Sequence, residues 1–510
     1  MSMQSAASRQ LRGPLGSLSA GMGVGGVEEN KLPYEHCRHH GADSGSVILG
    51  GGLAGLAAGH RLTDAGHPVT VIEKGGAVGG LARTIRHGGF RFDLGGHRFL
   101  ADNKQTMTLV SGLLGKELLT VPRSSRIFMN GKYVDYPLNP VNALLGLGIS
   151  TTTSIIFDYA GEKIRRLISA GPPLISLEDW VVAHFGRIMF ELYFKDYSEK
   201  VWGLNCSRIS MEWVARRIDG LSLWKAVRHA LFRLKSNGYK TLTDHFVYPR
   251  LGIGVLSDRL QERIVCSNQV RVGSEVREVY RTDREITGIE VQDSGGMSLV
   301  RGSNYLSSIP LTVLVRKMRP KPPPEVLAAV DRISFRSLVV VAVMLRRKRV
   351  TDLTWLYFPG KEIPFGRIHE PTNWSAAMAP AGQTHLVIEY FCDQGDHVWN
   401  ASDEKLVTET SEQLQRLGFI NSREVIDSRV LKVPHAYPVF SVDYQKHLRV
   451  VTDWLERFEN LHLIGRSGRY SYLNMDHAME SGIKAAGKVL QRSGAHLSMP
   501  ERIAACPCRV

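Results

Sequence analysis

The most constraining feature of this sequence is a glycine-rich turn between two short apolar segments. Residues 47–49 are an apolar run that enters the turn at 50–55, residues 56–65 have helix-forming composition, and residues 68–73 have the pattern of a second strand. A strand, a glycine turn, a helix and a strand in this order predict a βαβ unit with parallel strands. The expected fold class is therefore α/β, built on a Rossmann-like domain.

The glycines of this turn have distinct roles in a dinucleotide-binding domain. Gly50 allows the tight turn, Gly52 lets backbone N–H groups approach a pyrophosphate, and Gly55 permits close packing of the helix. The positive N-terminal end of that helix faces the phosphates. Glu73 ends the second strand, where its carboxylate can accept hydrogen bonds from ribose hydroxyls.

Length and composition limit the class of protein. A chain of 510 residues with 43% hydrophobic residues can form two or three domains with a large core. No run reaches the roughly 18 apolar residues of a membrane-spanning helix, so no transmembrane segment is expected. The six cysteines form no C-x-x-C pair, which indicates neither a metal site nor a disulfide framework. A cytoplasmic location is the simplest expectation.

The formal net charge of +15 is compatible with a nucleic acid, a membrane surface or an anionic substrate as a partner. The densest basic run, residues 346–349, follows an apolar run at 338–345 and is interpreted as a buried strand emerging into solvent. We expect no nucleic-acid partner. A non-enzymatic dinucleotide-binding scaffold or a basic nucleic-acid-associated protein is the alternative that salt-sensitive nucleic-acid binding would support.

Pattern changes along the chain predict its domain organisation. The middle favours helices, the stretch 270–300 alternates as strands do, with turn signals at 282–283 and 294–296, and a final helix begins near Met475. The predicted segments are a flexible leader (1–45), a first part of the dinucleotide-binding domain (46–139), a helical substrate-binding insertion (140–236), a second part of the dinucleotide-binding domain (237–300), a mixed-sheet substrate-binding domain (301–440), the C-terminal part of the dinucleotide-binding domain (441–492) and a tail (493–510).

Two further motifs identify the cofactor by resemblance. Residues 78–84, Val-Gly-Gly-Leu-Ala-Arg-Thr, and 92–99, Phe-Asp-Leu-Gly-Gly-His-Arg-Phe, resemble motifs of FAD enzymes in the amine oxidase and protoporphyrinogen oxidase superfamily. The first is similar to a GG doublet in which small residues let the chain pass against FAD and an arginine reaches toward phosphate. The resemblance implies FAD bound without a covalent link.

Several motifs resemble UDP-galactopyranose mutase in particular, and together they span residues 47–489. They are the Gly-Gly-His-x-Phe of 95–99, Asn130-Gly131-Lys132, Tyr-Pro-Leu-Asn at 136–139, Tyr-Ser-Glu-Lys-Val-Trp-Gly at 197–203, Phe-Gly-Arg-Ile-His-Glu-Pro at 365–371, Ala436-Tyr437-Pro438-Val439 and the stretch 465–476. The resemblance implies redox-neutral pyranose–furanose isomerisation of a nucleotide sugar through an adduct at N5 of reduced flavin.

The resemblance also implies roles for individual residues. The catalytic residues would be His97, Arg367 and Arg466. The two arginines would clamp a diphosphate to which Tyr437 and Tyr472 donate, Trp202 would stack near the base or sugar, and His97 would lie against the isoalloxazine. The implied cofactor-binding residues are Gly50, Gly52, Leu53, Ala54, Gly55, Glu73, Lys74, Gly80, Leu81, Ala82, Arg83, Gly96, His97, Val276, Gly465, Arg466, Asn474 and Met475.

Each role has an alternative that the residues leave open. Arg466 could anchor FAD phosphate, Tyr437 could pack at a strand end, Trp202 could belong to the core, and His97 could be structural. Asn474 stands where the mutases often have Asp. The alternative activity is that of an FAD-dependent oxidase, dehydrogenase or desaturase. The partners left open are a homodimer and a reductant, either NAD(P)H or a reductase protein, because no second G-x-G-x-x-G is present.

Overall fold

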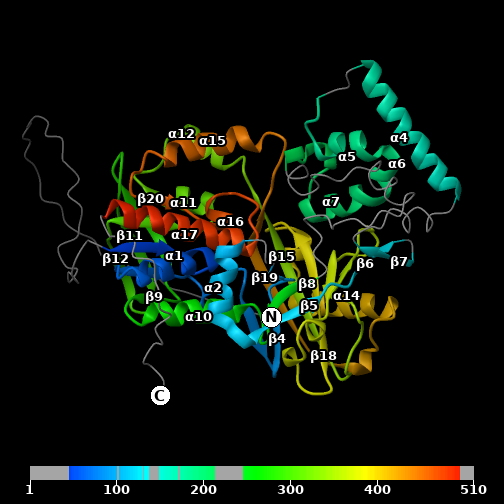
Figure 1. The fold of residues 1–510 in the computed structure, drawn as a ribbon, viewed down its shortest axis with the longest axis horizontal. Helices are drawn as coiled ribbons and strands as arrows, with labels where there is room; N and C mark the ends of the chain where they lie inside the picture. Colours follow the sequence, from blue (N-terminus) through cyan, green and yellow to red (C-terminus); the bar gives the residue numbers. More distant parts are fainter. Residues whose placement is uncertain are drawn as a thin grey trace, which may run out of the picture. The chain divides into compact units, whose positions relative to one another are not determined.

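The βαβ unit predicted from the glycine-rich turn is present. The computed structural model describes residues 45–99, 103–129, 131–136, 149–169, 173–212 and 245–493 (Figure 1). Near the start of this part, β1 (Ser46–Leu49), α1 (Leu53–Asp64) and β2 (Val69–Ile72) follow one another, and β1 pairs parallel with β2. The predicted elements and their parallel pairing are confirmed.

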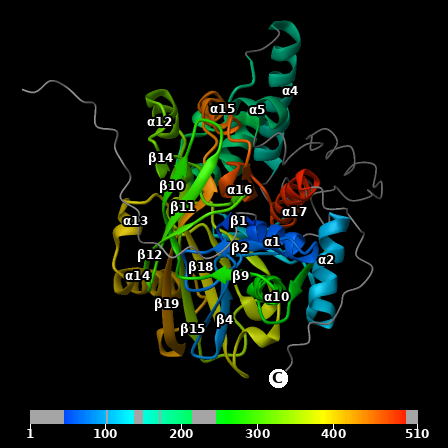
Figure 2. The same ribbon diagram turned by 90° about the vertical axis from the view of Figure 1, so that its left-hand side faces the viewer.

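Segments from distant parts of the chain complete this sheet. Its strand order is β20 (Leu461–Leu463), β13 (Asn304–Ser307), β1, β2 and β9 (Gln269–Arg271), and every neighbouring pair is parallel. Parallel sheets need helices over their faces. Here α1 lies beside α17 (Met475–Arg492), as both views show, and it also contacts α10 (Gly254–Val265) (Figures 1 and 2).

Small residues bring these elements close together. A Cβ on Gly482 in α17 would lie 2.0 Å from the backbone oxygen of Ala54 in α1, and a Cβ on Gly55 would lie 2.1 Å from the oxygen of Gly50. Neither position can hold a larger side chain without moving backbone. Gly55 therefore has the close-packing role expected of the third glycine.

A second sheet is antiparallel in most of its pairs. Its order is β12 (Gly296–Val300), β11 (Ile286–Asp293), β10 (Glu275–Arg281) and β14 (Met318–Arg319). The turn signal at 282–283 falls between β10 and β11, and Ser294-Gly295 falls between β11 and β12, as predicted.

The third sheet has seven strands and is mixed, because β6 pairs parallel with β16 while its other pairs are antiparallel. In order, its strands are β19 (Val425–Pro438), β15 (Phe335–Leu345), β18 (Thr384–Cys392), β17 (Arg367–His369), β16 (Trp355–Tyr357), β6 (Ser125–Met129) and β7 (Lys132–Tyr136). β15 ends at Leu345 and exposed basic residues follow, which confirms the interpretation of the basic run.

Helices α4 (Ile149–Ser169), α5 (Leu177–Phe185), α6 (Arg187–Met189) and α7 (Lys195–Trp202) form a group beside the seven-stranded sheet, with α4 at its outer edge in both views (Figures 1 and 2). This group is the described part of the predicted helical insertion. Residues 140–148, 170–172 and 213–236 of that insertion lie outside the described residues, as do the predicted leader to residue 44 and the tail from residue 494.

The remaining elements are short connections and covering helices. They are the pairs β3 (Thr84–His87) with β4 (Phe90–Asp93) and β5 (Leu118–Pro122) with β8 (His245–Pro249), and the helices α2 (Lys104–Leu114), α11 (Leu311–Arg316), α12 (Pro324–Val330), α13 (His397–Asn400), α14 (Asp403–Arg416), α15 (Tyr444–Leu455) and α16 (Gly465–Gly468).

Sheet membership differs from the predicted segments in two places. β13 belongs to the parallel sheet although it follows residue 300, and β6 and β7 belong to the seven-stranded sheet although they precede residue 140. Both exchanges arise from pairing between strands far apart in the sequence, which local patterns do not reveal.

Within the described residues, no helix is long and apolar enough to cross a membrane, and no three metal-ligating side chains gather into a site. Cys206 and Cys392 are buried free thiols.

Candidate functional site

The glycine-rich turn has the conformation that its sequence requires. Gly50 adopts a φ of +98°, and a Cβ there would lie 2.3 Å from Oγ of Ser308. Gly52 has open space on its Cβ side, where the nearest atom is Cα of Gly80 at 3.9 Å. Leu53 and Ala54 are buried at the start of α1. The turn therefore leaves room beside Gly52 and the N-terminus of α1, as a pyrophosphate needs.

Glu73 is fixed at the end of β2 by backbone donors. Its Oε2 accepts from the N–H of Gly51 at 2.7 Å and its Oε1 from the N–H of Gly75 at 2.7 Å. Each carboxylate oxygen keeps a further acceptor site. The orientation of Glu73 is thus set by the turn itself, and ribose recognition by its remaining lone pairs stays a prediction.

The GG doublet packs directly on the glycine turn. Gly79 and Gly80 have φ of +109° and +55°, and the N–H of Gly79 donates to the oxygen of Gly51 at 2.8 Å. Nε of Arg83 is buried and has no hydrogen-bond partner. A buried guanidinium nitrogen without a partner is costly unless a ligand satisfies it. The open side of Gly52 and the unpaired Arg83 nitrogen fit a bound dinucleotide such as FAD.

The remaining predicted cofactor-binding residues near the doublet and after β2 have only ordinary contacts within the protein. Ala82 is buried and closes the turn by donating from its N–H to the oxygen of Gly79 at 2.9 Å, while Leu81 is half-buried. Lys74 is exposed and pairs with Glu275 at 3.1 Å. Val276 is buried in the core beside that pair. No contact in the structure assigns these residues to a cofactor.

The C-terminal segment returns to the glycine turn. Gly465 has a φ of +70°, and its Cβ would lie 2.9 Å from Cβ of Ala54. Asn474 is the exposed N-cap residue of α17, whose first residue, Met475, is half-buried. This late segment therefore lies beside the first turn, and a direct role of Asn474 and Met475 in cofactor binding stays a prediction.

The glycines before His97 are explained by protein groups. A Cβ on Gly96 would lie 2.0 Å from Cη2 of Trp355, and a Cβ on Gly95 would lie 3.4 Å from Cδ of Glu389. The backbone at Gly96 thus lies directly against the indole of Trp355. This accounts for the need for glycine at 96 without invoking the isoalloxazine.

His97 is neutral at physiological pH. Burial lowers the pKa of its imidazole to about 4, and the nearby charges of Arg466 and Arg367 act in the same direction. Its Nδ1 lies 3.0 Å from the oxygen of Gly95, an acceptor, so Nδ1 carries the proton. Nε2 is consequently the unprotonated nitrogen and can accept a hydrogen bond.

Arg367 is buried beside a carboxylate that sequence reasoning missed. Glu389 lies directly opposite Arg367 in the pairing of β17 with β18, and Nη2 of Arg367 lies 2.6 Å from Oε2 of Glu389. Burial acts to lower the pKa of Arg367, but Glu389 and Tyr437 outweigh it and hold that pKa well above its ordinary value. The charge of Arg367 is therefore offset within the protein.

Glu389 also connects Arg367 to the His97 segment. Its Oε1 accepts from the N–H of Gly96 at 3.2 Å and lies 3.8 Å from Nδ1 of His369. Glu389 was detectable as the single acidic residue in the apolar run Thr384–Cys392. A lone charge in a strand that is buried on both faces requires a partner.

Arg466 has a different environment. Its Nε donates to the oxygen of Leu473 at 2.8 Å, and its guanidinium carbon lies 5.3 Å from the ring centre of Tyr437 and 5.1 Å from that of Tyr472. Within the described ranges no carboxylate forms an ion pair with it. The two tyrosines thus flank a guanidinium whose charge is not neutralised.

A turn with an unusual backbone brings Tyr472 back to Arg466. Tyr470 adopts a φ of +48°, rare for a residue other than glycine, and the N–H of Ser471 donates to the oxygen of Arg466 at 3.0 Å. The hydroxyl of Tyr470 holds this conformation, because its single proton lies between the oxygens of Ser334 and Val439, each 2.7 Å from Oη.

Trp202 belongs to the core in this structure. It is 3% exposed and lies edge-on to Tyr437, with ring centres 6.4 Å apart, and near Phe440. It supports Tyr437 from behind, which favours the core alternative over stacking on a ligand. Nζ of Lys200 in the same motif has three N–H donors and is surrounded by the backbone oxygens of Phe358, Gly360, Ile363 and Phe365.

Tyr197 and Tyr357 are further residues that sequence reasoning missed. Their ring centres are 5.7 Å apart, and the charge of Arg367 acts on the pKa of both hydroxyls. Tyr197 is the first residue of the motif at 197–203. Its position on α7, five residues before Trp202, was the signal that could have marked it as a site residue. The structure thus brings together His97, Arg367, Arg466, Tyr437 and Tyr472 from four separate stretches of sequence.

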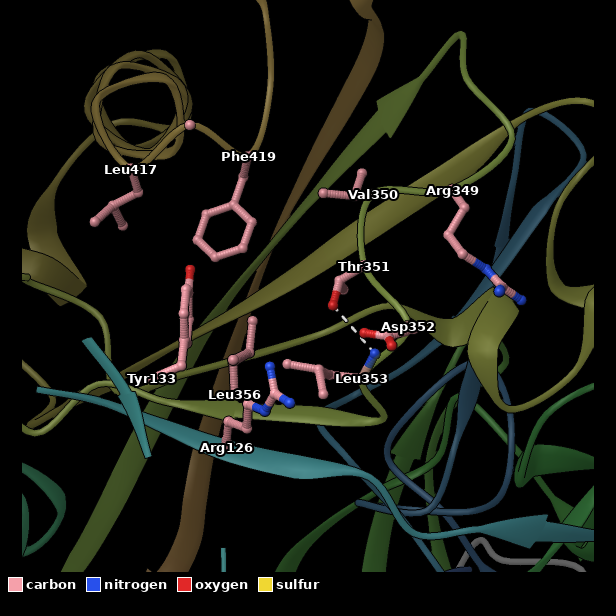
Figure 3. Close-up of a pocket in the computed structure, with 11 residues that line it drawn as sticks. Arg126, Tyr133, Arg349, Val350, Thr351, Asp352, Leu353, Leu356, Leu417 and Phe419 are labelled. Atoms are coloured by element: carbon pink, nitrogen blue, oxygen red, sulfur yellow. Dashed lines mark hydrogen bonds between the residues drawn. The ribbon is translucent and has the colours of Figure 1, made fainter. Parts of the chain in front are cut away.

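A pocket of about 490 Å³ lies elsewhere and contains none of the predicted site residues. Leu356 of β16 lines it, whereas its neighbours Trp355 and Tyr357 face the His97 side, since side chains alternate along a strand. In Figure 3, Tyr133 and Phe419 lie across from Val350 and Thr351. The lining residues are Arg126, Tyr133, Arg349, Val350, Thr351, Asp352, Leu353, Leu356, Leu417, Gly418 and Phe419.

Comparison with known proteins agrees with this geometry. The pattern of the flavin containing amine oxidoreductases matches residues 53–490. The L-amino-acid oxidase of Siganus canaliculatus is 22% identical over 94% of this chain and 90% of its own length. Protoporphyrinogen oxidase 2 of Arabidopsis thaliana is 27% identical over 28% of this chain, which spans only 29% of that relative.

Solved structures share the fold. A reduced UDP-galactopyranose mutase aligns with a TM-score of 0.76 and 21% identity over 89% of this chain and 96% of its own. A putrescine oxidase bound to putrescine aligns with a TM-score of 0.58 and 16% identity over 88% of this chain and 99% of its own. The predicted α/β fold with a mixed second sheet is confirmed.

Proposed function

Because this chain belongs to the flavin containing amine oxidoreductase family and is an FAD-dependent enzyme, we propose that it binds a nucleoside-diphosphate sugar and isomerises the sugar between pyranose and furanose forms without net oxidation. The observation that carries the proposal is the environment of Arg466. A guanidinium without a carboxylate partner, flanked by the hydroxyl-bearing rings of Tyr437 and Tyr472, suits a diphosphate.

The side chains around this arginine divide the work of holding such a substrate. Arg466 donates to phosphate oxygens through the guanidinium nitrogens that its contact with Leu473 leaves available. The hydroxyls of Tyr437 and Tyr472 add neutral donors, and Arg367 orients Tyr437 by donating to its hydroxyl at 3.0 Å. Reduced FAD, when bound, supplies an electron-rich nitrogen for reaction at the anomeric carbon.

The neutral imidazole of His97 has a separate role. Since Nδ1 donates to Gly95, Nε2 faces the site as an acceptor for a flavin N–H or a sugar hydroxyl. A neutral imidazole adds no charge that would compete with Arg466 for the diphosphate. Glu389 keeps the His97 segment in place through the N–H of Gly96.

A substrate titration tests the proposal. UDP, dTDP and GDP sugars are added to the FAD-loaded protein, once oxidised and once reduced with dithionite, while the flavin spectrum is followed and products are analysed. We expect a furanose isomer from one nucleotide class only in the reduced sample. Absence of binding by all three classes in both states contradicts the proposal.

A second function is favoured by the ion pair of Arg367 with Glu389. Because this pair offsets the charge of Arg367 and leaves Arg466 without a carboxylate partner among the described residues, the site also suits a substrate with a single carboxylate, which an FAD-dependent oxidase or dehydrogenase would oxidise. Rapid reoxidation of reduced flavin by oxygen or a quinone, together with no nucleotide-sugar binding, supports this alternative.

A further inference from the structure

Helix α4 exposes an unusual amount of apolar surface. Leu167, Ile168 and Phe157 are 85%, 81% and 77% exposed, and Ile164 and Ile156 are 56% and 48% exposed. Scattered exposed apolar residues are ordinary, but five large ones on one helix of a folded protein mark an interaction surface. None of these residues contributes to the site around Arg466.

The exposed apolar residues share one side of the helix. At about 100° per residue they cover an arc of about 120°, which runs from Ile156 through Leu167, Ile164 and Phe157 to Ile168 and also includes Ala160. Lys163 lies just outside one edge of this arc and Arg165 lies beyond the other. The apolar arc is therefore bordered by a cationic side chain on each side.

The acidic residues of α4 face the protein. Glu162 is 9% exposed and binds Arg165 at 2.6 Å and Arg166 at 2.7 Å. Asp158 accepts from the N–H of Ile188 in α6 at 2.9 Å, which fixes the helix to its neighbour. The fully exposed positions of α4 consequently include Lys163 and Arg165 but neither acidic residue.

We propose that α4 docks on an anionic lipid surface, with its axis parallel to the bilayer and its apolar arc at the boundary of headgroups and acyl chains. An apolar face with basic residues at its borders is the pattern of interfacial helices. Lys163 carries its charge at one border of the arc, where its Nζ can reach lipid phosphates, and the guanidinium of Arg165 lies beyond the other border in an ion pair with Glu162. The net charge of +15 adds a general attraction.

A second copy of the chain fits this surface less well. Symmetric packing of two α4 helices would bring Lys163 of both copies to the same contact, and the arc offers no carboxylate to offset the two charges. The arc of about 120° is also wider than the narrow seam along which two helices pack. Anionic headgroups supply the missing counter-charge.

Vesicle flotation tests the proposal with the full-length, FAD-loaded protein. One set of vesicles is pure phosphatidylcholine and the other is an equal mixture with phosphatidylglycerol. We expect the bound fraction to be larger on the mixed vesicles and to fall with salt. The double variant Leu167→Gln, Ile168→Gln should weaken this binding about tenfold or more, because both side chains leave the apolar phase.

Matched variants separate the surfaces. Val265→Gln with Met297→Gln removes two apolar residues that are 50% and 51% exposed elsewhere and should leave vesicle binding unchanged. Flavin absorbance and circular dichroism establish that each variant is folded. Equal binding by the α4 variant and the parent protein, or no binding to mixed vesicles, overturns the proposal. Concentration-dependent self-association that the α4 variant abolishes, without lipid binding, assigns the surface to a second copy and also overturns it.

Discussion

The two arginines of the candidate site lie in contrasting regions. Arg367, on a strand of the seven-stranded sheet, is buried against the carboxylate of Glu389. Arg466, on the short helix after β20, contacts backbone oxygens and the faces of two tyrosines. Arginine thus forms an internal ion pair in one region and leaves its charge available to a ligand in the other. An arginine in a sequence motif can therefore bind an anionic ligand only where no carboxylate of the protein pairs with it.

The largest expected effect concerns folding. Arg367→Met leaves Glu389 as an unpaired buried charge and should lower the free energy of unfolding by about 3–5 kcal/mol in urea titrations. Adding Glu389→Met should recover most of this loss, because both charges are then gone. Arg466→Met, which leaves no partner charge behind, is the control and should cost about 1 kcal/mol. Equal losses of unfolding free energy in Arg367→Met and Arg466→Met would contradict the difference between the two arginines.

The next effect concerns binding. Arg466→Met should weaken binding of a nucleoside diphosphate by about 2 kcal/mol or more, as loss of a desolvated charge partner does. Calorimetric titration measures this change. The Arg367→Met, Glu389→Met double variant should lose less affinity, since the pair contributes little net charge. A larger loss of affinity in the double variant than in Arg466→Met would mean that Arg367, and not Arg466, binds the diphosphate.

A smaller effect should follow from releasing the charge of Arg367. Glu389→Gln keeps hydrogen-bonding atoms near Arg367 and Gly96 but removes the negative charge, so nucleoside-diphosphate affinity should rise by about 1 kcal/mol. Glu424→Gln, whose carboxylate pairs with Arg347 just after the end of β15, is the matched control and should change nothing. Unchanged affinity in Glu389→Gln would mean that Arg367 does not face the ligand.

The smallest effect concerns His97, which feels both arginines. Its folded-state pKa of about 4 lies below the ordinary value of 6.5, so the unfolded chain binds its proton more tightly. The contribution of His97 therefore lowers stability as pH falls from 6.5 to about 4. Arg466→Met should raise this pKa more than the Arg367→Met, Glu389→Met double variant does, as measured by NMR titration of the imidazole. A larger pKa shift in the double variant would contradict the conclusion that the charge of Arg367 is offset and that of Arg466 is not.

Local sequence patterns were sufficient to predict the main features of the dinucleotide-binding part of the molecule. The turn at Gly50, the packing at Gly55 and the helix after Asn474 each follow from residue types in a short stretch, and the structure contains all three. These features are local because a tight turn or a helix start depends on a few neighbouring residues. FAD as the cofactor followed from the same stretches together with the GG doublet.

The other half depended on pairs that no short stretch reveals. Gly96 was interpreted through the flavin, whereas the indole of Trp355, from a distant strand, explains the missing side chain. Glu389 was passed over because its partner Arg367 lies across a strand pairing, not beside it in sequence. Asp93 in the same motif is likewise structural, since it accepts from the hydroxyls of Thr84 and Tyr248.

The parallel sheet joins the two ends of the chain, and this arrangement has a consequence during synthesis. α1 is complete by Asp64, but α17, which covers it, begins at Met475. At about 5–20 residues per second a ribosome takes on the order of 20–80 s to make the intervening chain. The apolar face of α1 must wait that long for its cover, so the cofactor-binding fold is completed only after α17 has been synthesised.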